Sequence, residues 1–167
     1  MEILWAPWRM KYIEYTIIEK EKTCFICDAV KSKNLKENLV IFKGQHTVLL
    51  MNKYPYNTGH LLLSPIKHIG SLDQLTKEEL CSLNIMLKNT INMLKKALNP
   101  DGFNIGINLG QTAGAGLEDH LHIHIVPRWN GDTNFMPVIS HTKVIPESLN
   151  DTYEKLIKYQ HILSEKD

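Results

Sequence analysis

Three histidines alternate with apolar residues in one short stretch, and this alternation constrains the fold more than any other feature of the chain. The stretch reads His120-Leu121-His122-Ile123-His124-Ile125-Val126. Side chains on a β-strand alternate between the two faces of a sheet, so we expect all three imidazoles on one face. Their Cα atoms would be spaced roughly 6.5 Å apart. Leu121, Ile123 and Ile125 would then face the core. The pattern predicts a strand that presents a row of histidines.

A glycine-rich loop, Asn108 to Gly116, comes directly before the histidines. It is not the GxGxxG motif of a dinucleotide fold, because a strand follows it where that motif has a helix, and it lacks the Gly-Lys-Ser/Thr ending of a P-loop. Simple turn formation is one explanation of its glycines. The alternative is an anion nest, since free backbone N–H groups beside a histidine face suit a phosphate.

The composition is that of one soluble globular domain. The chain has 167 residues, of which 43% are hydrophobic and 22% charged, and its formal net charge is +1. This balance gives no indication of a nucleic-acid partner or a membrane partner. The sequence contains no apolar run suited to a transmembrane helix and no signal-peptide pattern, so we expect a cytoplasmic protein.

Two of the three cysteines form the motif Cys24-Phe25-Ile26-Cys27. In a reducing compartment this spacing indicates a metal-binding pair or a redox pair. The helix-opening context of a thioredoxin-like redox motif is not evident in the sequence. A structural zinc site would need two further ligands. The candidates are His68 and His120, with His46 and His60 as rivals, and spacing alone does not choose among them.

Hydrophobic patterning predicts an α+β fold with an antiparallel sheet and one long helix. Thr76 and Glu79 have the spacing of a capping box, and an apolar stripe follows them until Asn99-Pro100 end the helix. The stripe consists of Leu80, Leu83, Leu87, Ile91, Leu94 and Leu98. Besides the histidine strand, we expect strands over residues 39–42, 47–51, 60–64 and 103–110.

Two segments flank the main domain, which we assign to residues 24–146. Residues 1–23 are predicted to form an aromatic N-terminal arm. Residues 147–167 are assigned to a C-terminal helix that packs on the same domain, with helix expected over 147–164. The mild apolar stripe of that helix consists of Leu149, Tyr153, Leu156 and Ile157.

Three explanations compete for the histidine row. The first is a tri-histidine zinc centre with an open position, although catalytic zinc usually takes ligands from more than one element. The second is a structural role, which is common for one buried histidine but not for three in register. The third is nucleophilic catalysis, in which a neutral imidazole attacks phosphorus and the phosphoramidate that forms divides one difficult step into two easier ones. The neighbouring glycine loop favours the third explanation.

The run from His120 to Val126 resembles the signature of the histidine triad (HIT) family: histidine, apolar, histidine, apolar, histidine and two apolar residues. The CxxC motif, the Gly59–Pro65 strand, Lys67-His68, the amphipathic helix and the glycine loop recur in the family's order. The resemblance therefore extends from Cys24 to Pro146. It implies a HIT-like antiparallel sheet with helices, a homodimer with a continuous sheet, and activity as a nucleotide hydrolase or transferase.

The resemblance also implies roles for individual residues. His122 would be the nucleophile that becomes nucleotidylated, and His124 would contact the α-phosphate and help the leaving group. By similarity to zinc-containing members and to galactose-1-phosphate uridylyltransferase, structural zinc would have the ligands Cys24, Cys27, His68 and His120. The residues that fall where family members contact the ribose or line the phosphates are Asn52, Asn108, Gly114 and Gly116.

The segments around the triad resemble the diadenosine tetraphosphate phosphorylase branch. Many hydrolase members carry Gly-Gln-Ser/Thr shortly before the triad, whereas this chain has Gly116-Leu117-Glu118-Asp119 there. The loop before that segment and the tail after Pro127 look like those of the phosphorylases. We therefore expect a nucleotidyl-transferring enzyme that cleaves a dinucleoside polyphosphate, with phosphate as acceptor and magnesium as a candidate cofactor. The alternatives are a hydrolase of dinucleoside polyphosphates or nucleoside phosphoramidates, and a nucleotide-binding adaptor with weak activity.

Overall fold

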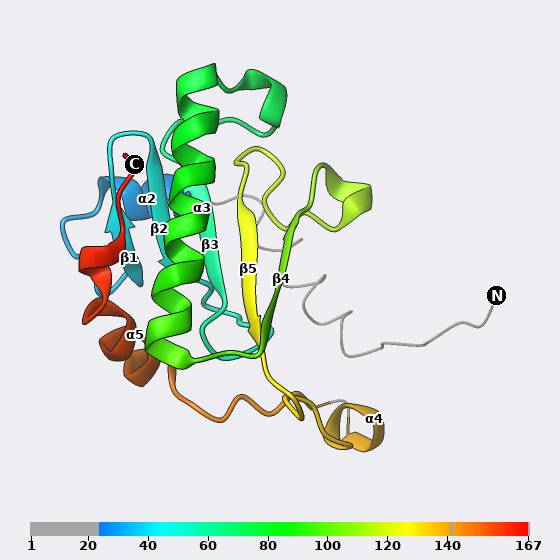
Figure 1. The fold of residues 1–167 in the computed structure, drawn as a ribbon. Coiled ribbons are helices and arrows are strands. Elements are labelled where there is room, and N and C mark those ends of the chain that lie inside the picture. The colour runs from blue at the N-terminus through cyan, green and yellow to red at the C-terminus, as the bar shows by residue number, and fades with distance from the viewer. Residues whose placement is uncertain (1–23, 141, 167) are drawn as a thin grey trace.

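A five-stranded antiparallel sheet forms the centre of the fold in the computed structural model, which describes residues 24–140 and 142–166 (Figure 1). The strand order is β1-β2-β3-β5-β4, and all neighbouring strands run antiparallel. The strands are β1 (Val40–Lys43), β2 (Thr47–Met51), β3 (Leu61–Pro65), β4 (Gly102–Ile107) and β5 (Ile123–Arg128). The predicted α+β class is therefore confirmed, whereas the N-terminal arm expected over residues 1–23 lies outside the described residues.

Helices lie on both faces of this sheet. The long helix α3 (Lys77–Leu98) runs along one face with α5 (Leu149–Ile157) beside it, and α2 (Phe25–Lys31) lies behind the sheet (Figure 1). The short elements are η1 (Leu72–Gln74), η2 (Gln111–Ala113), α4 (Met136–Ser140) and η3 (Gln160–Ile162). No helix in the described part of the chain is long and apolar enough to cross a membrane.

Strands β2 and β3 are buried on both faces, which divides the interior into two hydrophobic clusters. Leu49 and Leu63 pair across the strands and belong to the cluster under α3 and α5. Leu50 and Leu62 pair next to them and belong to the cluster under α2. Because paired residues share a face, the pairing of Leu62 with His124 places that histidine on the α2 face of the sheet.

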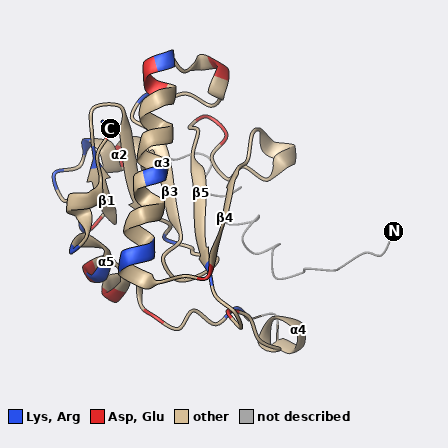
Figure 2. Ribbon diagram, in the orientation of Figure 1, with Lys and Arg blue, Asp and Glu red and all other residues tan. Residues whose placement is uncertain are grey.

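Helix α3 begins with the predicted capping box, since Thr76 and Glu79 bond to each other's backbone N–H groups. Figure 2 shows acidic residues in its first turn and basic residues toward its end, which complements the helix dipole. The predicted stripe was partly wrong, because Leu80 is 41% exposed and the core takes other positions instead. Those positions include Met86, Thr90 and Met93. Thr90 can be buried there because its hydroxyl donates to the Met86 carbonyl.

The predicted histidine strand is shorter than expected. Only His124 lies within β5, whereas His120 and His122 precede it in irregular backbone. Extending the register of β3 and β5 would place Leu121 opposite Pro65, which has no N–H to donate to the ladder. The Leu121 backbone bonds elsewhere: its carbonyl accepts from the Ser64 hydroxyl at 2.6 Å, and its N–H donates to the Ile69 carbonyl. Ile123 and Ile125 do face the core as predicted.

Two further expectations about helices need correction. The CxxC motif does open a helix, because Cys24 is the N-cap of α2 and its sulfur accepts from the Cys27 N–H. The C-terminal helix is shorter than the predicted 147–164 and is followed by η3. Tyr153 and Leu156 of α5 are buried in the same cluster as α3, consistent with the predicted apolar stripe.

Candidate active site

Four predicted metal ligands converge beside the start of α2. The candidate ligand atoms of Cys24, Cys27, His68 and His120 all lie within 4.8 Å of one another. Nδ1 of His120 is 3.1 Å from the Cys24 sulfur, and Nδ1 of His68 is 3.2 Å from the Cys27 sulfur. Two thiols and two imidazoles are the donor set that tetrahedral zinc prefers, so these four residues could bind a metal.

The His120 ring is oriented for that role by a second contact. Its Nε2 lies 2.9 Å from the Pro65 carbonyl, which can only accept, so Nε2 carries the proton. The lone pair of Nδ1 is then directed at the cysteines, as a metal ligand requires. The rival ligands are occupied elsewhere, since His46 lies 3.5 Å from the Glu78 carboxylate and His60 contacts His124.

His122 is held in one tautomer by the backbone beside it. Its Nδ1 lies 2.8 Å from the carbonyl oxygen of His120, so Nδ1 carries the proton and donates to that oxygen. Nε2 is consequently left with a free lone pair. His120 therefore serves the site twice, with its ring among the cysteines and its carbonyl on His122. The tri-histidine zinc centre is not formed, because the three rings have different partners.

A fourth histidine completes the cluster. The Tyr56 N–H donates to Nδ1 of His60 at 3.1 Å, so His60 carries its proton on Nε2. That Nε2 lies 3.0 Å from Nδ1 of His124 and donates to it. The proton of neutral His124 is thereby placed on Nε2. The ring centroids of His122 and His124 lie 5.0 Å apart, so the ring with a free Nε2 lone pair is next to the ring with an Nε2–H.

Burial keeps these imidazoles neutral. Desolvation is the largest cause in each case, lowering the pKa of His60 to about 3 and that of His124 to about 4. The pKa of His122 is also lowered, chiefly by burial, which outweighs the opposite effect of its bond to the His120 carbonyl. At neutral pH the cluster therefore offers an uncharged nucleophile rather than an imidazolium.

The other predicted site residues lie around this cluster. Nδ2 of Asn52 is 3.3 Å from Nδ1 of His60. Asn108 follows β4 at the point where its pairing with β5 ends, and its amide donates to the Gly114 carbonyl at 3.4 Å. Gly116 is exposed in the same loop. Three of the loop's amides, those of Ala113, Gly114 and Ala115, already donate within the loop, so other groups would have to bind an anion.

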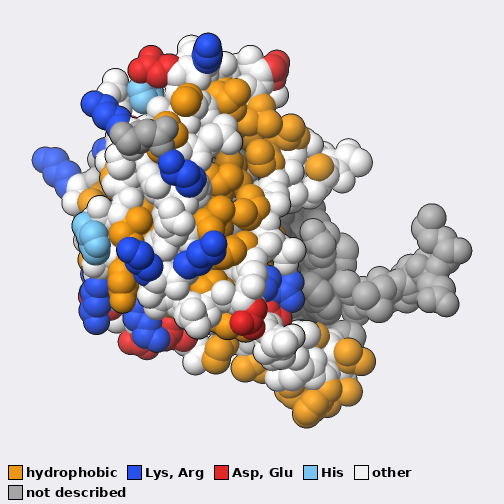
Figure 3. Space-filling model, in the orientation of Figure 1, with side chains coloured by type: hydrophobic (Ala, Val, Ile, Leu, Met, Phe, Trp, Pro, Cys, Tyr) orange, Lys and Arg blue, Asp and Glu red, His pale blue; other side chains and the backbone are white. Residues whose placement is uncertain are grey.

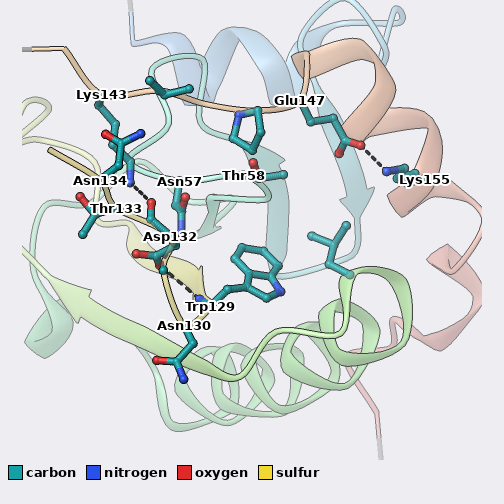
Figure 4. Close-up of a pocket in the computed structure, with 14 residues that line it drawn as sticks. Asn57, Thr58, Trp129, Asn130, Asp132, Thr133, Asn134, Lys143, Glu147 and Lys155 are labelled. Carbon is teal, nitrogen blue, oxygen red and sulfur yellow. Dashed lines mark hydrogen bonds and ion pairs between the residues drawn. The ribbon is translucent and has the colours of Figure 1, made fainter. Parts of the chain in front are cut away.

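A separate cavity of about 510 Å³ lies at the other end of β5 (Figure 4). Its wall includes Trp129, whose indole N–H donates to the Asn99 carbonyl, and Asn57, whose amide donates to Asp132. Arg128 donates to the same carboxylate and lowers the pKa of Asp132 to about 2. Trp129 is thus held by hydrogen bonds to Asn99 and Asp132, outside the histidine cluster.

His60 is the functional residue that sequence reasoning missed, because it was considered only as a rival metal ligand. It is two residues before Leu62, the strand partner of His124. Residues two apart on a strand share a face, so His60 is a diagonal neighbour of His124. That relation follows from the register of β3 with β5, which the sequence alone does not provide.

Comparisons with known proteins agree with these observations. A family model described as the HIT domain matches residues 33–131. The AP-4-A phosphorylase of Mycobacterium tuberculosis is 37% identical over 157 residues, which cover 91% of this chain and 80% of that protein. A bis(5'-adenosyl)-triphosphatase of Dictyostelium discoideum is 31% identical over 94 residues, which cover 56% of this chain and 62% of that protein.

Solved structures show the same fold. A hypothetical histidine triad nucleotide-binding protein from Sulfolobus tokodaii has a TM-score of 0.63 at 26% identity, covering 82% of this chain and 89% of that chain. A Zn-bound histidine triad family protein from Mycobacterium smegmatis has a TM-score of 0.65 at 22% identity, covering 83% and 94%. These likenesses confirm the antiparallel α+β architecture.

The neutral state of His60 makes stability depend on pH. Between its ordinary pKa of 6.5 and its folded value of about 3, the unfolded chain binds a proton that the folded chain does not. The free energy of unfolding should therefore fall as the pH drops below 6.5, by up to about 1.4 kcal/mol per pH unit from this group. Urea denaturation at pH 7 and pH 5 should show a smaller pH dependence for His60→Gln than for the wild type. The exposed His161→Gln should behave as the wild type, and an unchanged dependence in His60→Gln would contradict this account.

Proposed function

The chain belongs to the HIT domain family, and on this basis we propose that it is an enzyme that cleaves dinucleoside polyphosphates through a nucleotidyl-histidine intermediate. The observation that carries the proposal is the pair of complementary tautomers on two neighbouring rings, those of His122 and His124. His122 offers the lone pair of Nε2, and His124 offers an Nε2–H beside it. A lone pair for phosphorus and a donor for oxygen are what a two-step nucleotidyl transfer requires.

In the first step, Nε2 of His122 attacks the α-phosphorus in line. The N–P bond forms while the P–O bond to the leaving nucleoside polyphosphate breaks, and that group departs as an anion. The Nε2–H of His124 stabilises the negative charge that develops on the oxygens, and complete proton transfer is not needed. The substituted His122 ring is cationic, and the His120 carbonyl accepts its remaining N–H.

In the second step, an acceptor oxygen attacks the same phosphorus and restores His122. We propose inorganic phosphate as that acceptor, which turns diadenosine tetraphosphate into ADP and ATP. Support comes from the 37% identity to an AP-4-A phosphorylase over 91% of the chain, compared with 56% coverage by the triphosphatase relative. With water as acceptor the products would be AMP and ATP, which is the alternative reading.

The substrate contacts are proposed on position in the fold. Asn52 lies against the His60 side of the cluster and is suited to the ribose hydroxyls. Asn108 lies where β4 ends beside His122, and it closes the glycine loop through the Gly114 carbonyl. This loop, together with Gly116, would border the phosphates. Because three of its amides donate internally, we assign the direct phosphate contacts chiefly to side chains and to the remaining amides.

We propose that the Cys/His cluster is a structural zinc site. Its ligands come from α2, from the loop after β3 and from the segment before β5, so bound zinc would fix three chain segments to one another. The metal would hold the backbone that carries His122 without entering the reaction. The magnesium expectation has no such support, because the one candidate metal cluster among the described residues offers sulfur and nitrogen, not oxygen ligands.

We further propose a homodimer formed through β4. This strand is at the edge of the sheet and its outward residues are exposed, with Ile105 44% exposed and Leu109 just beyond it also 44%. Figure 3 shows hydrophobic side chains in a band beside α3 on the side of β4. Unprotected edge strands with apolar side chains pair readily with a second copy, which would continue the sheet.

Product analysis tests the reaction. Incubation with diadenosine tetraphosphate should give ADP and ATP only when inorganic phosphate is present, and formation of AMP regardless of phosphate would replace phosphorolysis by hydrolysis. His122→Ala should lower kcat by about a thousandfold or more, because it removes the nucleophile. His161→Ala, at an exposed position in η3, is the matched histidine control. Retained turnover in His122→Ala would reject the nucleotidyl-histidine.

Metal analysis tests the zinc proposal. We expect about one zinc per chain in the purified protein, lost in Cys24→Ser together with part of the stability. Cys81→Ser changes an exposed cysteine outside the cluster and should retain the metal. His122→Ala should also retain it, because His122 is not a ligand in the cluster. If zinc is lost from the His122 variant but kept in Cys24→Ser, the metal is bound at His122 and not at the Cys/His cluster, and the proposal is contradicted.

Light scattering after size exclusion tests the dimer. The expected mass is about 38 kDa, twice the 19.2 kDa of one chain. Ile105→Lys places a charge on the exposed edge and should produce the monomer. Leu35→Lys, before β1 at the opposite edge of the sheet, is the control and should remain dimeric. A monomeric wild type would exclude this interface.

A further inference from the structure

Tyr56 is the aromatic residue in contact with both members of the His60–His124 pair. Its ring is stacked on His124, with centroids 5.7 Å apart and planes inclined by 14°. It also lies against His60, with centroids 4.6 Å apart. Nothing in the proposed reaction uses this side chain, although its backbone N–H already fixes the His60 tautomer.

The exposures of Tyr56 and His60 show which of the two residues forms the outer surface. His60 is 1% exposed and Tyr56 is 49% exposed, so the tyrosine lies on the solvent side of the pair that it covers. Removing its ring would admit water to the hydrogen bond between Nε2 of His60 and Nδ1 of His124. Water can both donate and accept, so it would compete for that bond. The His124 ring would then no longer be held in one tautomer.

We propose that Tyr56 is a positioning residue that holds His124 in the orientation and tautomer from which its Nε2–H can reach the substrate. This positioning role rests on the proposed function of His124. It comes from the ring, since an offset-stacked aromatic pair restrains the plane of its partner whether or not the tyrosine has a hydroxyl. The backbone N–H of Tyr56 then fixes His60, and its ring restrains His124.

The first measurement separates kcat from KM for three variants. Tyr56→Ala should lower kcat by about threefold to tenfold with little change in KM, as expected for the loss of one aromatic contact. Tyr56→Phe keeps the ring and should restore the wild-type kcat. Tyr56→Leu serves if the alanine variant folds poorly, and should lie between the two. The exposed Phe135→Ala, outside the histidine cluster, is the control for losing an aromatic ring.

Each contrary outcome overturns the inference. An unchanged kcat in Tyr56→Ala would show that His124 needs no such restraint. An increase in KM alone would make Tyr56 a substrate contact. A loss in Tyr56→Phe equal to that in Tyr56→Ala would assign the effect to the hydroxyl.

A second measurement reads the tautomers directly and does not require turnover. Nitrogen-15 spectra of the imidazoles should show His124 as a single Nε2–H tautomer in the wild type and in Tyr56→Phe, and as averaged tautomers in Tyr56→Ala. His60 should stay a single Nε2–H tautomer in all three proteins, because the backbone N–H of residue 56 is retained. A single His124 tautomer in all three proteins would refute the positioning role. If the wild type turned over no dinucleotide, the proposed function would fail while this spectroscopic result still decided the role of Tyr56.

Discussion

The arrangement of the site depends on one missing backbone donor, the N–H that Pro65 lacks. The ladder between β3 and β5 ends at the pair Leu63–Ile123, and Pro65 has no N–H to donate to Leu121 if the pairing continued, so the chain before β5 leaves the sheet. Its backbone is then fixed by the Ser64 hydroxyl and the Ile69 carbonyl. The Pro65 carbonyl, in turn, is available to His120. A continuous strand would have presented three equivalent imidazoles, whereas the interrupted one gives each a different partner.

Hydrogen bonds to groups of fixed polarity then determine the chemistry of each ring. The His120 carbonyl and the Tyr56 N–H cannot exchange the roles of donor and acceptor, so they fix the protonated nitrogen of His122 and His60. His124 receives its tautomer from His60. Burial keeps the rings uncharged at neutral pH. The free lone pair on Nε2 of His122 is therefore a result of backbone geometry as much as of the histidines themselves.

Local patterns in the sequence predicted the elements well, and contacts between distant segments explain the differences. The capping box at Thr76 is local, so the start of α3 was correct. The buried face of that helix was displaced because Met86 and Met93 fit the core and Thr90 satisfies its own hydroxyl. The metal ligands followed from family resemblance, since spacing could not exclude His46 or His60. The substrate contacts stay predictions.

His120 combines two roles that belong to different parts of one residue. The ring faces the cysteines, but the group that orients His122 is the peptide carbonyl, which every amino acid possesses. That carbonyl is aimed by the backbone bonds of Leu121 to Ser64 and Ile69. The tautomer of His122 therefore does not depend on which side chain residue 120 carries. A substitution that changes only the ring at position 120 leaves in place the carbonyl to which His122 donates.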